Sequence, residues 1–279
     1  MSATAAQSAA TPALPAAGSS FYLGMRVLPK ARREAMYAVY AFCRAVDDIA
    51  DDGGPRPERA AALDRWRADI DALYAGEPRS STAGLAPYIR PYRLPRESFH
   101  EIIDGMQMDV DADIQAPDWA TLDLYCDRVA SAVGRLSARI FGLPGGEADQ
   151  LAHHLGRALQ LTNILRDIDE DAAINRLYLP REPMLARGMT DLTPAAVLAH
   201  PRLPEICAEV AERAIAFYDE ADRVMARQPS RLVRAPRLME AAYRSVLNRM
   251  VKRGWAPPRT RVGTDKLRLI GTVLRLVLT

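Results

Sequence analysis

The sequence predicts an all-α protein with a single domain. From Pro29 onward, apolar residues recur three and four positions apart, which is the spacing of one helix face, whereas the alternation typical of strands is scarce. No long linker or internal repeat separates two halves of the 279 residues. Hydrophobic residues make up 49% of the chain and aromatic residues only 6%, so aliphatic side chains and alanine are expected to fill the core.

Glycine and proline residues divide the helical pattern into segments. The predicted helices are residues 30–51, 57–75, 82–90, 95–110, 119–141, 145–171, 181–188, 193–199, 203–227, 230–253 and 265–277. Residues 1–19 are rich in Ala, Ser, Thr and Pro and lack the basic and apolar regions of a signal peptide. We therefore expect a disordered N-terminal tail over residues 1–19 and an all-α domain over residues 20–279.

The composition favours a cytoplasmic protein that does not bind nucleic acid. The formal charge of +2, from 37 basic and 35 acidic residues, is too balanced for a dedicated nucleic-acid binder. Cys43, Cys126 and Cys207 lie in apolar stretches without metal-ligand spacing, as expected for reduced core residues. No apolar run approaches the roughly 20 residues that a membrane-spanning helix needs.

Two aspartate-rich stretches each contain a pair of aspartates four positions apart, Asp47/Asp51 and Asp167/Asp171. Residues four apart share a helix face, so each pair should point two carboxylates the same way. The repulsion between them is removed by a cation, and Mg²⁺ binds through a few carboxylates, waters and substrate phosphates. Two such pairs facing each other would hold divalent cations and, through them, a diphosphate. The same stripes include Tyr40 and Arg44 on the first helix and Gln160 and Asn163 on the second.

Acidic stripes also occur on ordinary solvated helix faces, and this simpler interpretation applies to either pair taken alone. Calcium loops of the EF-hand type are excluded. The runs that begin at Asp109 and Asp167 have Ile114 and Ala172 where such a loop requires glycine. A non-catalytic helical scaffold and a helical metal-dependent phosphohydrolase are two further alternatives, although the paired His and Asp residues expected of the hydrolase are missing from the sequence.

Four sequence blocks occur in a fixed order along the chain. They are Ser19-Ser-Phe-Tyr22, Tyr40-Ala-Phe-Cys-Arg-Ala-Val-Asp-Asp-Ile-Ala-Asp51, Tyr125-Cys-x-x-Val-Ala-x-x-Val-Gly134, and Leu161-Thr-Asn-Ile-Leu-Arg-Asp-Ile-x-Glu-Asp171 followed by Asn175-Arg-Leu-Tyr178. Together these blocks resemble the squalene/phytoene synthase family, the head-to-head isoprenyl diphosphate synthases. The likeness extends from Gly18 to about Trp255. In place of the Ala-Gly-Thr-Val-Gly of much of the family, this chain has Ala-Ser-Ala-Val-Gly at residues 130–134.

This resemblance implies a fold, a cofactor and a set of metal ligands. The expected fold is a single-domain helical bundle of the isoprenoid synthase type with a central active-site cavity. The expected cofactor is Mg²⁺, with two or three ions that bridge the diphosphates of the substrates. The metal ligands that the resemblance implies are Asp47, Asp48, Asp51, Asn163, Asp167 and Asp171.

The resemblance also implies roles in binding and catalysis. Catalytic roles fall on Tyr40, Tyr125, Tyr178 and Arg44, with the tyrosines steering ionisation or proton loss. Substrate-binding roles fall on Ser20, Phe21, Arg44, Gln160, Arg166 and Arg176 at the diphosphates and on Val129, Ala130, Val133 and Gly134 along the prenyl chain. Simpler explanations exist: an Arg44–Asp48 ion pair, core tyrosines, a helix start at Ser20 and close helix packing at the small residues.

Within the family, the first and third blocks and the Asp-Asp-Ile-Ala-Asp motif look most like the members that form presqualene diphosphate in bacterial hopanoid pathways. The activity implied is Mg²⁺-dependent head-to-head condensation of two farnesyl diphosphates to presqualene diphosphate. The alternative is a phytoene synthase that condenses two geranylgeranyl diphosphates. The sequence contains no glycine-rich strand-to-helix loop for a nucleotide, so NADPH is not expected as a cofactor.

The C-terminal end is basic. From Ala241 onward there are nine Lys and Arg residues and a single acidic residue, Asp265, and residues 266–279 mix Leu and Val with Arg. This pattern suits an interfacial helix attracted to anionic lipid, so peripheral contact with the inner face of the membrane is expected. A solvated or core-packed terminal helix explains the same pattern.

Overall fold

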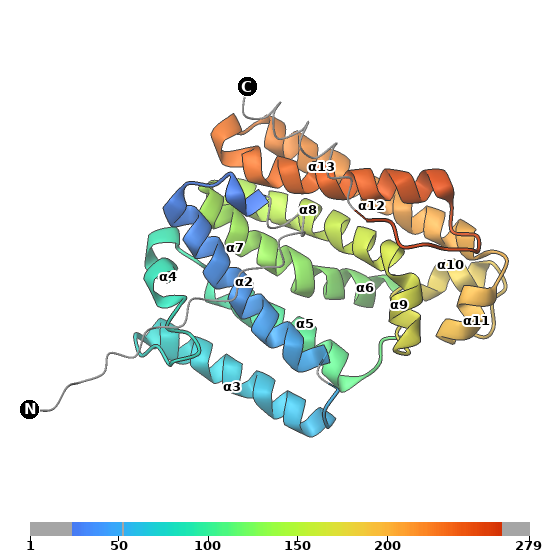
Figure 1. The fold of residues 1–279 in the computed structure, drawn as a ribbon, viewed down its shortest axis with the longest axis horizontal. Coiled ribbons are helices and arrows are strands. Elements are labelled where there is room, and N and C mark those ends of the chain that lie inside the picture. Colours follow the sequence, from blue (N-terminus) through green and yellow to red (C-terminus); the bar gives the residue numbers. More distant parts are fainter. Residues whose placement is uncertain (1–23, 52, 264–279) are drawn as a thin grey trace, which may run out of the picture.

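A computed structural model of the chain describes residues 24–51 and 53–263 (Figure 1). The predictions for the tail over residues 1–19, for Ser20 and Phe21, and for the helix over residues 265–277 lie outside these ranges. The helices are α2 (Lys30–Asp51), α3 (Arg56–Ala75), α4 (Ala86–Tyr92), α5 (Arg96–Asp111), α6 (Trp119–Cys126), the π-helix η1 (Asp127–Ser131), α7 (Ala132–Phe141), α8 (Gly145–Arg166), α9 (Ile168–Ala173), α10 (Arg181–Ala186), α11 (Pro194–Ala199), α12 (Leu203–Ala226) and α13 (Ser230–Arg253).

The helices are arranged in layers with α8 in the middle (Figure 1). α8 packs against α7, η1, α12 and α13, and α5 packs against α2, α3 and α7. Figure 1 shows α12 and α13 along one side of α8, and α7, α2 and α5 followed by α3 on the other. Over the described ranges an isolated β-bridge between Gln115 and Leu177 is the single non-helical pairing. The all-α prediction is confirmed.

Two clusters of buried apolar side chains form the core. One contains side chains of α8, α12 and α13, such as Leu161 and Leu247. The other contains side chains of α2, α3, α5 and α7, such as Val46 and Ile103. Val129 on η1 packs against both clusters. The π-helix therefore lies at the boundary between the two halves of the core.

Two of the predicted long helices are interrupted. The predicted helix over 119–141 contains the π-helical turn Asp127–Ser131. The predicted helix over 145–171 ends at Arg166 and resumes at Ile168, because Asp167 has φ −105° and ψ 17°. The backbone N–H of Asp167 still donates to the Asn163 carbonyl at 2.9 Å. The backbone therefore leaves the helical conformation at Asp167 with little loss of hydrogen bonding. The spacing of apolar residues is the same on both sides of the break, so the sequence pattern did not predict it.

The predicted helix over 82–90 is misplaced. Helix α4 begins at Ala86 and ends at Tyr92, while the residues before it form turns. Pro87 occupies the first turn, where a missing N–H costs nothing, and Pro91 lies close enough to the C-terminus that few hydrogen bonds are lost.

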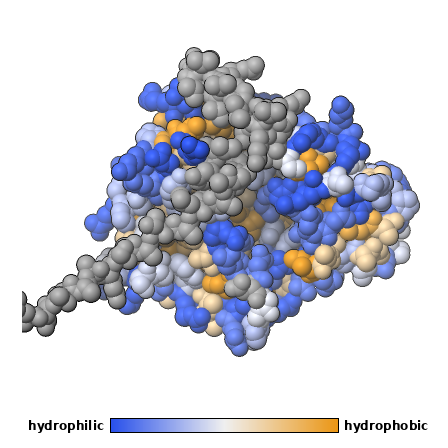
Figure 2. Space-filling model, viewed as in Figure 1, coloured by the Kyte–Doolittle hydropathy of each residue, from blue (hydrophilic) through white to orange (hydrophobic). Residues whose placement is uncertain are grey.

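The described helices and the visible surface bear on the predicted membrane contact. Among residues 24–51 and 53–263, no helix is both long enough and apolar enough to cross a membrane. In Figure 2, hydrophilic residues cover most of the face that is not drawn in grey, with hydrophobic residues in separate patches. Peripheral membrane contact was predicted for residues beyond the described ranges, and it stays a prediction.

One buried carboxyl group predicts a pH dependence of stability. Glu240 on α13 is 6% exposed, and burial, reinforced by Asp222, raises its pKa to about 7 even though Arg244 donates a hydrogen bond to it. Because the folded protein binds this proton more tightly than the unfolded chain, Glu240 stabilises the fold at low pH. That contribution, on the order of 2 kcal/mol, is lost as the pH rises from the ordinary glutamate value through 7.

Substitution of Glu240 by Gln is expected to flatten this dependence. The melting temperature of the wild-type protein should fall by several degrees more than that of Glu240→Gln between pH 5 and pH 8. Arg244 keeps Asp219 and Asp222 as partners in the variant. The exposed Glu212 on the neighbouring helix supplies the matched control, Glu212→Gln. Parallel pH curves for all three proteins would contradict the assignment.

Candidate active site

Residues of both acidic stripes line one cavity of about 590 Å³. α2 contributes Asp47 and Asp51, and the α8–α9 region contributes Asn163, Asp167 and Asp171. The other residues that line the cavity are Arg44, Met106, Asp109, Tyr125, Val129, Gln160, Ile164, Arg166, Arg176, Tyr178 and Arg261. The volume lies within the range of small-molecule sites. Segments from six parts of the chain thus meet around a strongly polar space.

On α2, the residues at positions 44, 47 and 51 share one face because three and four residues complete about one helical turn. Arg44 donates a hydrogen bond to Asp47 at 2.7 Å and also pairs with Asp48. Burial and the charge of Asp51 raise the pKa of Asp47 to about 6, although Arg44 acts in the opposite direction. Nearby positive charge therefore compensates this carboxylate only in part.

The second wall is also only partly compensated. Hydrogen bonds from Arg166 at 2.8 Å and Arg261 at 2.9 Å hold the pKa of Asp167 below its ordinary value, against the effect of burial. Burial and the charge of Asp167 raise the pKa of Asp171 to about 7, although Arg176 opposes the change. Each wall therefore contains one carboxylate whose ionised form is disfavoured in the absence of further positive charge.

The donor set of these walls fits a hard divalent cation. Asn163 adds a neutral oxygen, and its Oδ1 is buried without a hydrogen-bond partner. Within the part of the chain that the structure describes, no three acidic, histidine or cysteine side chains lie close enough together to hold a metal ion by themselves. This arrangement suits Mg²⁺, which usually takes one or two carboxylates and completes its coordination with water and substrate phosphate.

Arginines on several segments surround the carboxylates. Arg176 lies 3.4 Å from Asp51 and so connects the segment after α9 to α2. Arg261 was not predicted as a site residue, because a basic C-terminal stretch does not show where it folds back. The segment after α13 is held against α9 by Arg259, which forms two hydrogen bonds to Asp169 at 2.7 and 2.9 Å. This contact places Arg261 beside Asp167.

Two tyrosines and a buried aspartate form another part of the cavity wall. The hydroxyl of Tyr125 donates to Asp109 Oδ2 at 3.0 Å, and the hydroxyl of Tyr178 donates to Asp109 Oδ1 at 2.6 Å. The two rings are stacked with their centroids 4.8 Å apart. Asp109 is 4% exposed, and burial raises its pKa, while the hydroxyl of Tyr178 acts in the opposite direction.

Asp109 was not predicted as a site residue and was considered only as the start of a calcium loop. The sequence pattern nevertheless indicates its burial. Asp109 falls three residues after Met106, on the same face of α5 as the buried Ile102, and a carboxyl group in that phase must be buried. The β-bridge then brings Tyr178 to it, because Leu177 donates its N–H to the Ile114 carbonyl at 2.8 Å.

Four of the predicted site residues are not shown to line the cavity. Tyr40 and Asp48 lie on α2 but are not among the residues that line it. Asp48 pairs with Arg44, as the simpler explanation of this arginine proposed. Ser20 and Phe21 fall outside the described ranges. The roles of these four residues stay predictions.

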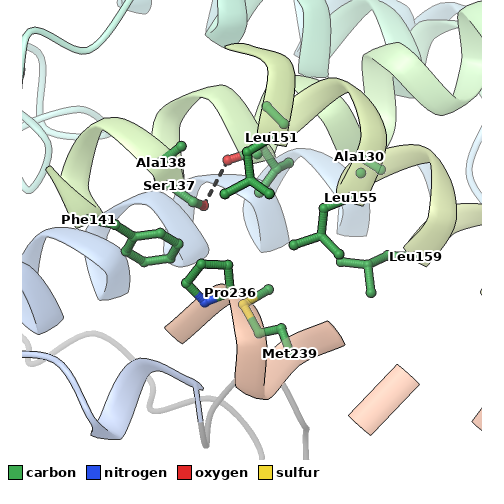
Figure 3. Close-up of a pocket in the computed structure, with 13 residues that line it drawn as sticks. Ala130, Ser137, Ala138, Phe141, Leu151, Leu155, Leu159, Pro236 and Met239 are labelled. Carbon is green, nitrogen blue, oxygen red and sulfur yellow. Dashed lines mark hydrogen bonds between the residues drawn. The ribbon is translucent and has the colours of Figure 1, made fainter. Parts of the chain in front are cut away.

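Ala130, Val133 and Gly134 line a second, smaller cavity of about 60 Å³ that is almost entirely apolar. Figure 3 shows Leu151, Leu155 and Leu159 of α8 in this cavity, with Pro236 and Met239 of α13 near them. The two cavities are neighbours, because Val129 and Gln160 line the first while Ala130 and Leu159 line the second. Gly134 also serves helix packing, since a Cβ there would lie 3.0 Å from Ala152 Cβ.

Several named proteins are similar in sequence to this chain over most of their length. A presqualene diphosphate synthase from Rhodopseudomonas palustris is 57% identical over 260 residues, which cover 93% of this chain and 93% of the relative. A presqualene diphosphate synthase from Zymomonas mobilis is 55% identical over 265 residues, or 95% of this chain and 91% of the relative. A phytoene synthase from Thermus thermophilus is more distant, with 37% identity over 74% of this chain and 70% of the relative.

Solved structures that resemble this one include a related synthase. The crystal structure of a squalene synthase from Alicyclobacillus acidocaldarius superposes with a TM-score of 0.77 and 32% identity, over 85% of this chain and 89% of that chain. The family model for squalene/phytoene synthases matches residues 14–268. The chain belongs to the squalene/phytoene synthase family.

Proposed function

We propose that the protein condenses two molecules of farnesyl diphosphate head to head to form presqualene diphosphate, with Mg²⁺ as cofactor. The observation that carries this proposal is the pairing of a carboxylate-rich, arginine-rich cavity with an adjoining apolar one. A prenyl diphosphate has the same two parts. The names of the relatives that are more than 50% identical support the choice of substrate and product.

The polar cavity supplies what the departure of diphosphate requires. Arg44, Arg166 and Arg176 donate charged hydrogen bonds suited to phosphate oxygens. Asp47, Asp51, Asn163, Asp167 and Asp171 are the residues that would hold Mg²⁺. When bound, Mg²⁺ neutralises negative charge that develops on the leaving diphosphate.

We assign the prenyl chains to the apolar part, which would also shield the cation from water. Loss of diphosphate from one substrate leaves an allylic cation, which the double bond of the second substrate captures before loss of a proton closes the cyclopropane. Tyr125 and Tyr178 line the polar cavity, and we assign their electron-rich rings and oxygens to stabilisation of this cation. The smaller cavity encloses about 60 Å³, so a prenyl chain that enters it must displace Leu155, Leu159 and Met239.

Incubation of the purified protein with farnesyl diphosphate and Mg²⁺, with and without NADPH, tests the proposal. The expected product retains a diphosphate, has thirty carbons by mass spectrometry and forms equally well without reductant. Addition of EDTA in excess over Mg²⁺ should abolish turnover, and Mg²⁺ in excess over EDTA should restore it.

Parallel incubations separate the alternatives. Consumption of geranylgeranyl diphosphate alone, with a forty-carbon product, would replace the proposal by phytoene synthesis. Release of phosphate or diphosphate without carbon–carbon bond formation would indicate a hydrolase. Turnover that is indifferent to EDTA would exclude the role given to the acidic walls.

A further inference from the structure

Asp109 occupies an unusual position for a carboxyl group in a helical core. It lies on α5 in the apolar phase of the helix and is 4% exposed, yet it also lines the polar cavity. Its two oxygens have one tyrosine each, Tyr125 at 3.0 Å and Tyr178 at 2.6 Å. Burial opposes ionisation of Asp109, whereas the charge of Arg176 and the two tyrosine hydroxyls favour it. The ionised carboxylate only accepts, so in that form both phenol hydroxyls must act as donors.

This geometry determines which part of each hydroxyl group faces the cavity. A phenol has one proton and two lone pairs. Once the proton of Tyr125 and that of Tyr178 are both directed at Asp109, only lone pairs are left for a bound molecule. The stacked rings, with centroids 4.8 Å apart, hold the two oxygens close together on one side. The pair therefore presents negative potential to the cavity and has no proton to donate to a diphosphate.

We propose that Asp109 is a positioning residue that directs the hydroxyl protons of Tyr125 and Tyr178 away from the substrate, so that both phenol oxygens face the allylic cation as electron-pair donors. The proposal rests on the function proposed above. It assigns the tyrosines to the cation rather than to the leaving diphosphate, which the arginines of the cavity bind. Preoriented dipoles are effective in such a site because they need no reorganisation when charge develops.

Asp109→Asn tests this arrangement with little change in volume. The amide has one acceptor oxygen and a donor NH₂, so one tyrosine hydroxyl must turn around and offer its proton to the cavity. We expect kcat for farnesyl diphosphate to fall about ten- to a hundredfold, the range of a lost polar contact in a transition state. KM should stay within about threefold of the wild-type value, because diphosphate binding does not involve Asp109. The share of farnesol formed by water capture of the cation should rise.

A double-mutant cycle separates this role from a purely structural one. In a Tyr125→Phe/Tyr178→Phe background, Asp109→Asn should lower kcat by less than about threefold, since Asp109 has lost the groups through which it acts. Asp111→Asn, two residues further on the same helix and exposed, is the matched control and should match the wild-type protein in kcat, KM and farnesol share. All comparisons use whichever prenyl diphosphate the wild-type protein consumes.

The outcomes are distinct from those of the proposed function. If the wild-type protein forms the expected product and Asp109→Asn retains full kcat, the proposal for Asp109 fails alone. It fails also if Asp109→Asn costs the same factor with and without the two hydroxyls. Should Asp109→Asn not fold, the Tyr125→Phe/Tyr178→Phe protein decides the question, because full kcat without either hydroxyl overturns the proposal. A wild-type protein that consumes no prenyl diphosphate overturns both.

Discussion

Replacement of Asp171 by Asn should lower kcat/KM for farnesyl diphosphate about a thousandfold, the effect expected when a group that stabilises developing charge is lost. The same substitution should stabilise the protein in the absence of Mg²⁺. Arg166 and Arg261 bind Asp167 rather than Asp171, so the variant leaves both ion pairs of that wall intact. Loss of activity and gain of stability then arise from one cause, a carboxylate whose charge is compensated only when cation and substrate are present.

The expected gain depends on pH in a defined direction. Burial and Asp167 raise the pKa of Asp171 to about 7. Above that pH the ionised side chain weakens the fold, and below the ordinary aspartate value it is protonated in both folded and unfolded states. Asp171→Asn should therefore raise the free energy of unfolding by on the order of 2 kcal/mol at pH 8 and by least near pH 4. The melting temperature should rise correspondingly, most at pH 8.

Thermal unfolding and steady-state kinetics on the same samples provide the measurement. Wild-type protein should gain stability when Mg²⁺ and inorganic diphosphate are added together, whereas Asp171→Asn should gain much less. Asp149→Asn is the control, because Asp149 lies near the start of α8, pairs with Arg139 and lines neither of the two cavities. A variant that keeps wild-type kcat/KM, or that unfolds at a lower temperature than wild type at pH 8, would contradict the role assigned to Asp171.

Gly156→Ala should strongly destabilise the core. A Cβ at position 156 would lie 2.7 Å from the Cα and the backbone nitrogen of Ser131. Because these are backbone atoms, no rotation of a side chain can relieve the overlap, and η1 must move away from α8. We expect a loss of about 3 kcal/mol, which corresponds to roughly 6–10 °C in melting temperature.

Gly146→Ala on the same helix is the control, because it changes glycine to alanine without any steric overlap. No atom lies within 4 Å of a Cβ built at Gly146, which is exposed. Alanine there should raise stability by less than about 0.5 kcal/mol, since Gly146 lies in the first turn of α8 and the larger penalty applies to glycine in the middle of a helix. Activity should also fall in Gly156→Ala, because displacement of η1 moves Val129 in the polar cavity and Ala130 in the apolar one. Equal melting temperatures for the two variants would show that α8 and η1 tolerate a larger separation.

The helices and the acidic stripes were predictable because both are local. Three- and four-residue spacing places Asp47 and Asp51 on one face of α2 wherever that helix packs. The same spacing holds for Asn163, Asp167 and Asp171, and it survives the break between α8 and α9 because the hydrogen bond from Asp171 N–H to the Asp167 carbonyl is kept at 2.8 Å. Neither that break nor the π-helical turn has a counterpart in the apolar pattern.

The sequence by itself determined the helical architecture, the two carboxylate-bearing faces and, through its motifs, the family. Only the tertiary structure decided which groups meet those faces. Asp109 receives its two tyrosines from positions 16 and 69 residues further along, and Arg261 reaches Asp167 across 94 residues. Such contacts depend on how helices pack and where loops return. Periodicity within one helix contains no information about either, so the electrostatic balance of the site follows from the fold.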